Sequence, residues 1–209
     1  MAGFGSLFEQ GAIWHFGTPI YTSLIRSNKF DQVQKDLDTV YNTMLAEDKF
    51  QHHRRSRSHM LSDTTFSSNF IEEYKLENFQ EELEFQLMEY LKGIGSDIGT
   101  VRPFTYKITS SWMTLNKKDS YAVIHSHGRS DISGVYYFKT NGEDGDIFFE
   151  SPNKVIHTSY VFSHFGRSWS HKPQVGKIIL FPGWLEHGVA TNHTDNDRVS
   201  ISFNIDFIK

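Results

Sequence analysis

The sequence predicts an α+β protein, mainly β, in which helices at the N-terminal end precede a barrel or sandwich of short strands. From Tyr106 onward, short apolar runs rich in β-branched and aromatic residues alternate with turn residues, and no helical stretch lies between them. Before residue 100, apolar residues instead recur every three or four positions. The 209 residues suit one domain, with residues 1–100 as helical support and edge strand and residues 101–209 as the β core.

The composition excludes several classes of protein. The net charge of −4 predicts no bulk attraction to nucleic acid or to an anionic membrane surface. No apolar run approaches the roughly 18 residues needed to span a bilayer, and the N-terminus shows no secretory signal, so we expect a cytoplasmic protein. The chain has no cysteine, which excludes disulfides, thiolate metal ligands and cysteine nucleophiles.

The N-terminal half predicts one extended segment and two helices. Phe16–Ile25 is expected to be extended, and Pro19 favours an edge strand. Apolar spacings of three and four predict helices over Phe30–Leu45 and Phe70–Leu91, the second stopped by Gly93.

The polar connection Lys49–Asn69 contains the basic run HHRRSR. Such a run is most often a solvated loop, and the alternative is a flap that contributes to substrate binding.

The second half predicts strands separated by turn chemistry such as Asn141-Gly142 and Ser151-Pro152-Asn153. The expected strands are Tyr106–Leu115, Ala122–His127, Ile132–Lys139, Asp146–Glu150, Val155–Phe162, Lys177–Pro182, His187–Thr191 and Arg198–Phe207. The polar and aromatic loop His164–Gln174 is unassigned and could be a lid. Three tryptophans could line a pocket, although core or rim packing is the more common role: Trp112, Trp169 and Trp184.

Two histidines one residue apart, His125 and His127, end an apolar run. Side chains at positions i and i+2 of a strand lie on the same face, roughly 7 Å apart, so these imidazoles can converge on one ion. His187, near the start of a distant strand, could supply a third ligand at the mouth of the barrel and leave positions open for substrate and oxygen. Imidazole suits iron, zinc and copper alike, so the ligands alone do not identify the metal.

Eleven residues after His187 lies Arg198, and Ser200 shares its strand face. A buried arginine on an otherwise apolar strand needs an anionic partner. One reading is that Arg198 is exposed, or pairs with Asp195 or Asp197. The other is that it binds the carboxylate of a small cofactor, with the Ser200 hydroxyl as a second donor.

Five motifs in register resemble one family. They are HSH at 125–127, SGVYY at 133–137, GDIFFESP at 145–152, FPGWLEH at 181–187 and RVSISFN at 198–204. Together, over roughly Trp112–Ile205, they resemble the 2-oxoglutarate- and iron(II)-dependent oxygenases of the type found in marine bacteria and their phages.

The resemblance implies a double-stranded β-helix, or jelly roll, with helices packed on one face. It implies Fe(II) ligation by His125 and His187, and 2-oxoglutarate bound at its distal carboxylate by Arg198 with Ser200 beside it. Tyr137 would be a further donor to this cosubstrate, although strand register decides whether Tyr136 or Tyr137 faces the pocket. The implied reaction uses molecular oxygen to hydroxylate a substrate, with release of succinate and carbon dioxide.

One position departs from the wider superfamily, which uses two histidines and one carboxylate. His127 stands where the carboxylate is expected, so we interpret His127 as the third ligand, and Asp131 is the nearest carboxylate along the chain.

Two other functions are compatible with the sequence. One is a cupin-type three-histidine dioxygenase that needs no 2-oxoglutarate, and the other is a non-catalytic jelly-roll module for binding or structure. The substrate, a small molecule or a peptidyl side chain, is not specified by the sequence.

Overall fold

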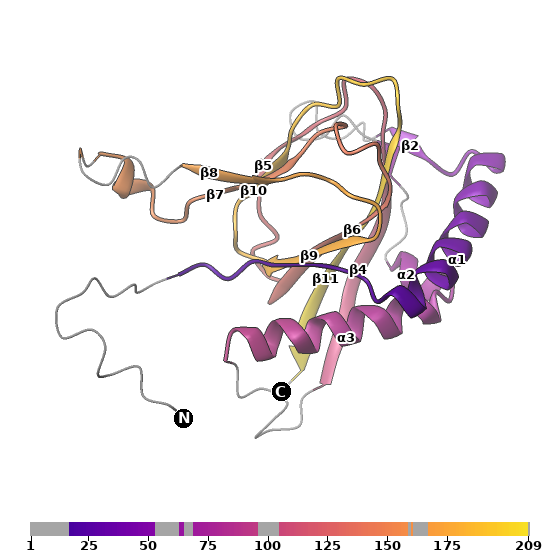
Figure 1. Ribbon diagram of the computed structural model, residues 1–209, viewed down its shortest axis with the longest axis horizontal. Coiled ribbons are helices and arrows are strands. Elements are labelled where there is room, and N and C mark those ends of the chain that lie inside the picture. The colour runs from indigo at the N-terminus through magenta and orange to yellow at the C-terminus, as the bar shows by residue number, and fades with distance from the viewer. Residues whose placement is uncertain are drawn as a thin grey trace.

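The fold consists of two facing antiparallel β-sheets with helices on the outer face of the larger one (Figure 1). The computed structural model describes residues 17–52, 63–64, 69–95, 105–158, 160 and 167–208. This arrangement confirms a mainly β protein with a jelly-roll core and helices on one side.

The larger sheet has seven strands in the order β1-β9-β6-β11-β4-β3-β2, and the smaller has four in the order β5-β10-β7-β8. The strands of the larger sheet are β1 (Tyr21–Leu24), β9 (Lys177–Pro182), β6 (Ile132–Lys139), β11 (Arg198–Ile208), β4 (Thr105–Asn116), β3 (Asp63–Thr64) and β2 (Gln51–His52). Those of the smaller sheet are β5 (Ala122–His125), β10 (His187–Val189), β7 (Ile147–Glu150) and β8 (Ser168–His171). The predicted edge strand near residue 20 is confirmed as β1, which pairs with β9.

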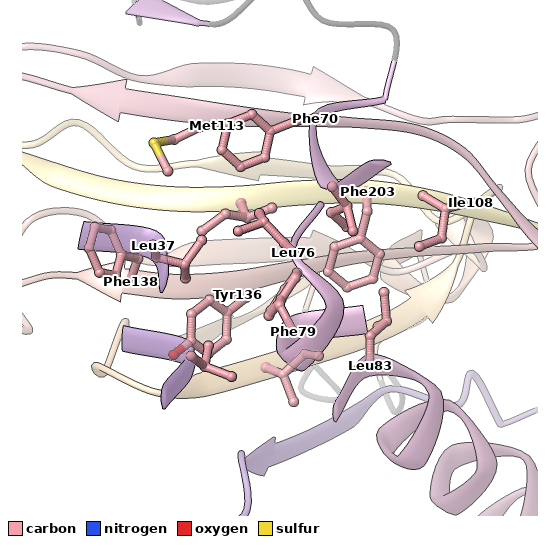
Figure 2. Packing of buried hydrophobic residues seen from close by; sticks show 14 of the residues in the cluster. Leu37, Phe70, Leu76, Phe79, Leu83, Ile108, Met113, Tyr136, Phe138 and Phe203 are labelled. Carbon is pink, nitrogen blue, oxygen red and sulfur yellow. The ribbon is translucent and has the colours of Figure 1, made fainter. Parts of the chain in front are cut away.

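Helices α1 (Ser27–Ala46) and α3 (Glu77–Gly93) cover the larger sheet because each carries an apolar stripe. Phe79 of α3 packs against Tyr136 and Phe203 from the sheet, with ring centroids 5.1 and 6.3 Å away (Figure 2). None of the helices in the described part of the chain is long and apolar enough to span a membrane.

Strand β11 connects this core to the interior of the jelly roll. Its residues Val199, Ile201 and Phe203 belong to the core beneath the helices. Because strand side chains alternate, Arg198 and Ser200 project from the opposite face, into the space between the two sheets. The period-two pattern of this strand therefore places polar side chains inside the barrel.

The single helix predicted over Phe70–Leu91 is wrong, because the chain breaks it into α2 (Phe70–Glu73) and α3. Lys75 adopts a left-handed conformation, with φ of 50°, and the Leu76 amide donates to the Ile71 carbonyl. The residue in a left-handed conformation after the end of α3 is Gly95, with φ of 67°, and not Gly93. Apolar spacing does not reveal such a break, since both pieces bury the same side of the chain.

The strand predicted over Val155–Phe162 is also wrong over its described residues, where Lys154–Thr158 forms the 3-10 helix η2. Val155 is 75% exposed, and the Thr158 hydroxyl donates to the Val155 carbonyl. Residues 159, 161 and 162 lie outside the described residues. The fourth strand of the smaller sheet is instead β8, inside the stretch that the sequence left unassigned.

The polar connection at 49–69 contributes only the two-residue strands β2 and β3 within its described part. Most of its basic run, at 53–57, lies outside the described residues, so the flap hypothesis stays a prediction.

Candidate functional site

Three histidines meet between the sheets, at the end of β5 and the start of β10. His125 and His187 are direct partners in the antiparallel pairing of these strands. His127 lies beyond β5, so the expectation that it shares a strand with His125 is wrong. Its position is fixed by a 2.8 Å hydrogen bond from its backbone amide to the Gly183 carbonyl. The three predicted ligands therefore converge although one of them is in a loop.

The ligand nitrogens of His125, His127 and His187 all lie within 4.8 Å of one another. The His125 ring centroid is 4.4 Å from that of His187 and 5.2 Å from that of His127. Nitrogens bonded to one metal at ~2.1 Å lie about 3–4 Å apart, so small ring rotations would bring this set into place.

Backbone carbonyls fix the tautomers of two of these histidines. Nδ1 of His125 lies 2.8 Å from the Val123 carbonyl oxygen, and Nδ1 of His187 lies 2.8 Å from that of Leu185. A carbonyl only accepts, so in both rings Nδ1 carries the proton and Nε2 keeps its lone pair. This is the arrangement that a metal-binding histidine requires.

Burial keeps two of the imidazoles neutral. The pKa of His187 is lowered to about 3 and that of His127 to about 4, mainly by desolvation and in smaller part by the neighbouring histidines, while the Leu185 carbonyl acts in the opposite direction on His187. A neutral imidazole is the form that binds metal, so His127 and His187 keep their metal-binding form below neutral pH.

These shifts predict how the stability of the metal-free protein depends on pH. Unfolded histidine titrates near 6.5, so between pH 6.5 and 4 the unfolded chain binds protons that the folded chain excludes. The free energy of unfolding should therefore fall as the pH falls through this window, by about 1 kcal/mol per pH unit for His187. Urea unfolding of the wild type and of His187→Gln at several pH values checks this. Equal pH slopes in the two proteins would contradict it.

Aromatic side chains surround the histidines. The Phe181 and Phe149 rings lie 4.7 and 6.1 Å from that of His187, and the Trp112 ring lies 5.8 Å from that of His127. Trp112 therefore borders the site, as one reading of the sequence proposed. Trp169 and Trp184 are 70% and 51% exposed and form no part of the buried core.

Arg198 is buried, with 3% of its surface exposed, and it points between the sheets. Its Nη1 donates to the carbonyls of Asp144, at 3.0 Å, and of Gly145. Within the described part of the chain its buried Nε has no hydrogen-bond partner. The alternative of an exposed Arg198 is therefore wrong. The alternative of a pair with Asp195 or Asp197 finds no support in the described part of the chain, where Arg198 Nη1 binds backbone carbonyls and Asp195 forms an ion pair with Lys118.

The turn before β7 holds this guanidinium in place. The buried Asp144 carboxylate accepts hydrogen bonds from the Thr140 hydroxyl and the Asn141 amide, which makes the turn rigid. Gly145 has a φ of +102°, and an added Cβ would lie 2.3 Å from the Ala190 carbonyl oxygen and 3.1 Å from Arg198 Nη1. Nothing in the sequence around Gly145 indicates that this turn is the anchor of Arg198.

Gly145→Ala should therefore destabilise the protein by about 2–4 kcal/mol, through overpacking and backbone strain. Chemical denaturation measures the loss. Gly142→Ala is a matched control, because it shares the positive φ, +83°, but its added Cβ meets nothing closer than 3.7 Å. Equal losses in the two variants would show that backbone conformation alone is responsible.

The register decides between the two tyrosines. Tyr137 pairs with Ser200 across β6 and β11 and belongs to the apolar cluster between the sheets. Tyr136 faces the helices, where its hydroxyl accepts a 2.9 Å hydrogen bond from Gln34 Nε2. Burial raises the pKa of Tyr137 far above its usual range. Tyr137 is thus the neutral hydroxyl on the Arg198 side of the sheet.

Asp131, the nearest carboxylate along the chain, is used elsewhere. Its Oδ2 accepts a 2.8 Å hydrogen bond from the Phe207 amide, and its own amide donates to Asp206 Oδ1. It is exposed, and it is not among the residues whose ligand atoms cluster with the histidines.

A family described as "Putative 2OG-Fe(II) oxygenase" matches residues 110–204, a little under half of the 209 residues. No curated protein sequence matches the chain.

Solved structures with the same fold cover most of the chain. A prolyl-4-hydroxylase from Pseudomonas putida has a TM-score of 0.62 at 11% identity, covering 90% of this chain and 92% of that one. SnoN, an α-ketoglutarate-dependent epimerase from nogalamycin biosynthesis, has a TM-score of 0.62 at 11% identity, covering 90% and 76%. HygX from Streptomyces hygroscopicus, with nickel and 2-oxoglutarate bound, has a TM-score of 0.59 at 13% identity, covering 90% and 82%.

Proposed function

The chain belongs to the 2-oxoglutarate- and Fe(II)-dependent oxygenase family, and on that premise we propose that it hydroxylates its substrate with release of succinate and carbon dioxide. Members of this family use Fe(II) and 2-oxoglutarate. Hydroxylation is our proposal and does not follow from the fold, because the same fold serves a hydroxylase and an epimerase.

We propose that His125, His127 and His187 are the iron ligands. One nitrogen from each of the three rings lies close to the other two, which supports this proposal. Backbone carbonyls also fix the tautomers of the His125 and His187 rings. A set of three imidazoles carries no ligand charge, so Fe(II) keeps its full 2+ charge. The chelation of an anionic cosubstrate is then more favourable than in a site with a carboxylate ligand.

The unpartnered Nε of Arg198 is the main observation in favour of 2-oxoglutarate as the cosubstrate. Nη1 is committed to two backbone carbonyls, which leaves the Nε side of the guanidinium for an anion. A buried donor without a partner costs about 1–3 kcal/mol, and more for a charged group, so a bound carboxylate would relieve a real penalty. We propose that Arg198 binds the distal carboxylate of 2-oxoglutarate, with Ser200 and Tyr137 as neighbouring donors.

The remaining roles follow from the surroundings of these residues. The chemistry that Fe(II) and 2-oxoglutarate supply when bound is the activation of oxygen, coupled to the conversion of the cosubstrate into succinate and carbon dioxide. Phe149 and Phe181 exclude water from the His187 side of the site. Trp112 lies beside His127, where it would contact a substrate, either a small molecule or a peptidyl side chain. We also propose that residues 1–100 support the β core within one domain.

A cupin-type dioxygenase without 2-oxoglutarate would share the histidines but would have no use for Arg198. The buried guanidinium with an unpartnered nitrogen therefore favours the cosubstrate-dependent reaction.

The test is to incubate the protein with Fe(II), oxygen and 2-oxoglutarate and to measure succinate. We expect slow succinate formation that requires all three and stops when the metal is chelated. Oxygen consumption that is independent of 2-oxoglutarate would support the cupin-type reaction instead.

A further inference from the structure

We propose that Asn116 is a second contact for the distal carboxylate of 2-oxoglutarate, opposite Arg198. The inference rests on the proposed function and adds a residue on a different strand, β4. Within the described part of the chain, two buried side-chain atoms have no hydrogen-bond partner, Arg198 Nε and Asn116 Oδ1.

These two atoms belong to residues that face each other. Arg198 and Asn116 are direct partners in the antiparallel register of β11 and β4. Opposed residues project from the same face of a sheet, with Cβ atoms about 4.5–5.5 Å apart. Leu115, the preceding residue, belongs to the core beneath the helices, so Asn116 points into the interior with Arg198. Both are nearly inaccessible, at 2% exposure for Asn116 and 3% for Arg198.

The backbone of Asn116 is held independently of its side chain. Asn192 Nδ2 donates to the Asn116 carbonyl at 3.1 Å and to the Asn196 carbonyl at 2.8 Å. The end of β4 is therefore fixed by a hydrogen bond that does not involve the side-chain amide of Asn116. A polar side chain fixed at a buried position without a partner is expected to have one in the working state of the protein.

A carboxylate can accept hydrogen bonds from both residues once the Asn116 amide is turned so that its NH2 group faces Arg198. It accepts only, and its two oxygens offer about four lone-pair sites. Arg198 Nε already presents a donor. A half-turn of the Asn116 amide about its Cβ–Cγ bond replaces the unpartnered oxygen with the NH2 group, which donates to the second carboxylate oxygen.

The test compares two keto acids in the Fe(II)-loaded protein under nitrogen, where no turnover occurs. One is 2-oxoglutarate and the other is 2-oxopentanoate, which has a methyl group in place of the distal carboxylate. A hydrogen bond to a charged group predicts that Asn116→Ala binds 2-oxoglutarate about tenfold or more weakly by calorimetry. Its affinity for 2-oxopentanoate should equal that of the wild type. An unchanged affinity for 2-oxoglutarate, or an equal loss for both keto acids, would overturn the assignment.

Two further variants separate recognition from structure. Asn116→Asp is isosteric and offers a carboxylate to Arg198 Nε, so its thermal midpoint without ligand should not fall. Its affinity for 2-oxoglutarate should fall more than that of Asn116→Ala, through charge repulsion, and this variant decides the question if Asn116→Ala does not fold. Asn192→Ala is the structural control. It should lower the thermal midpoint and change the affinities for 2-oxoglutarate and 2-oxopentanoate by the same factor.

The outcomes also separate this inference from the proposed function. A wild-type protein that binds no 2-oxoglutarate would refute the proposed function. A wild type that binds it, with Asn116 variants that bind it equally well, would refute the role of Asn116 alone.

Discussion

Substitution of His187 by alanine should remove Fe(II) binding and, with it, succinate formation. His187 supplies one of three nitrogens that lie within 4.8 Å of one another, and it is the most buried of the three. Loss of a hydrogen bond behind a metal ligand already costs about 10–100-fold in metal affinity, so loss of the ligand itself should cost more. Anaerobic titration with Fe(II), followed by metal analysis of the desalted protein, measures the change.

His193→Ala is the matched control, because His193 is exposed and follows β10 by only a few residues. It should bind Fe(II) like the wild type. Retention of stoichiometric iron by His187→Ala would remove this histidine from the proposed ligand set.

The second large effect is expected at Arg198. Arg198→Leu should bind 2-oxoglutarate about 100-fold or more weakly, because truncation of a buried charge pair costs about 2–5 kcal/mol. Its affinity for Fe(II) should be unchanged, since Arg198 donates to the carbonyls of the Asp144–Gly145 turn and to none of the histidines. Calorimetry with the Fe(II)-loaded protein under nitrogen separates the two affinities.

Arg167→Ala controls for the loss of one positive charge, since Arg167 is exposed. Arg198→Lys keeps the charge but loses the planar fork, so we expect it to recover only part of the affinity. An Arg198→Leu protein with wild-type affinity for 2-oxoglutarate would contradict the proposed role of this residue.

Much of the fold was predictable because the β core follows local rules. Alternation along β11 predicted that Arg198 and Ser200 share one face, and the structure places Val199 and Ile201 on the other, beneath the helices. Turn chemistry separated most strands. The convergence of His125 and His187 was predictable from an apolar run that ends in histidine and from a second run that begins with one. Arg198 was identifiable because a charge on an otherwise apolar strand needs a partner.

Other features depend on tertiary context. The segment at Lys154–Thr158 has strand-like residues, yet Val155 is exposed and the segment forms a 3-10 helix. The choice between Tyr136 and Tyr137 required the register of β6, since a slip of one residue exchanges the two faces. Asn116 carried no sequence signal, because an asparagine at the end of a strand normally indicates a turn.

The most direct test of the account is a crystal structure of the protein grown with Fe(II) and 2-oxoglutarate under nitrogen, with anomalous diffraction recorded at the iron absorption edge. We expect one iron peak bonded to nitrogens of His125, His127 and His187, and 2-oxoglutarate with its distal carboxylate at Arg198. An iron ion that is not bonded to His127, or that is bonded to a carboxylate of the chain, would contradict the three-histidine site.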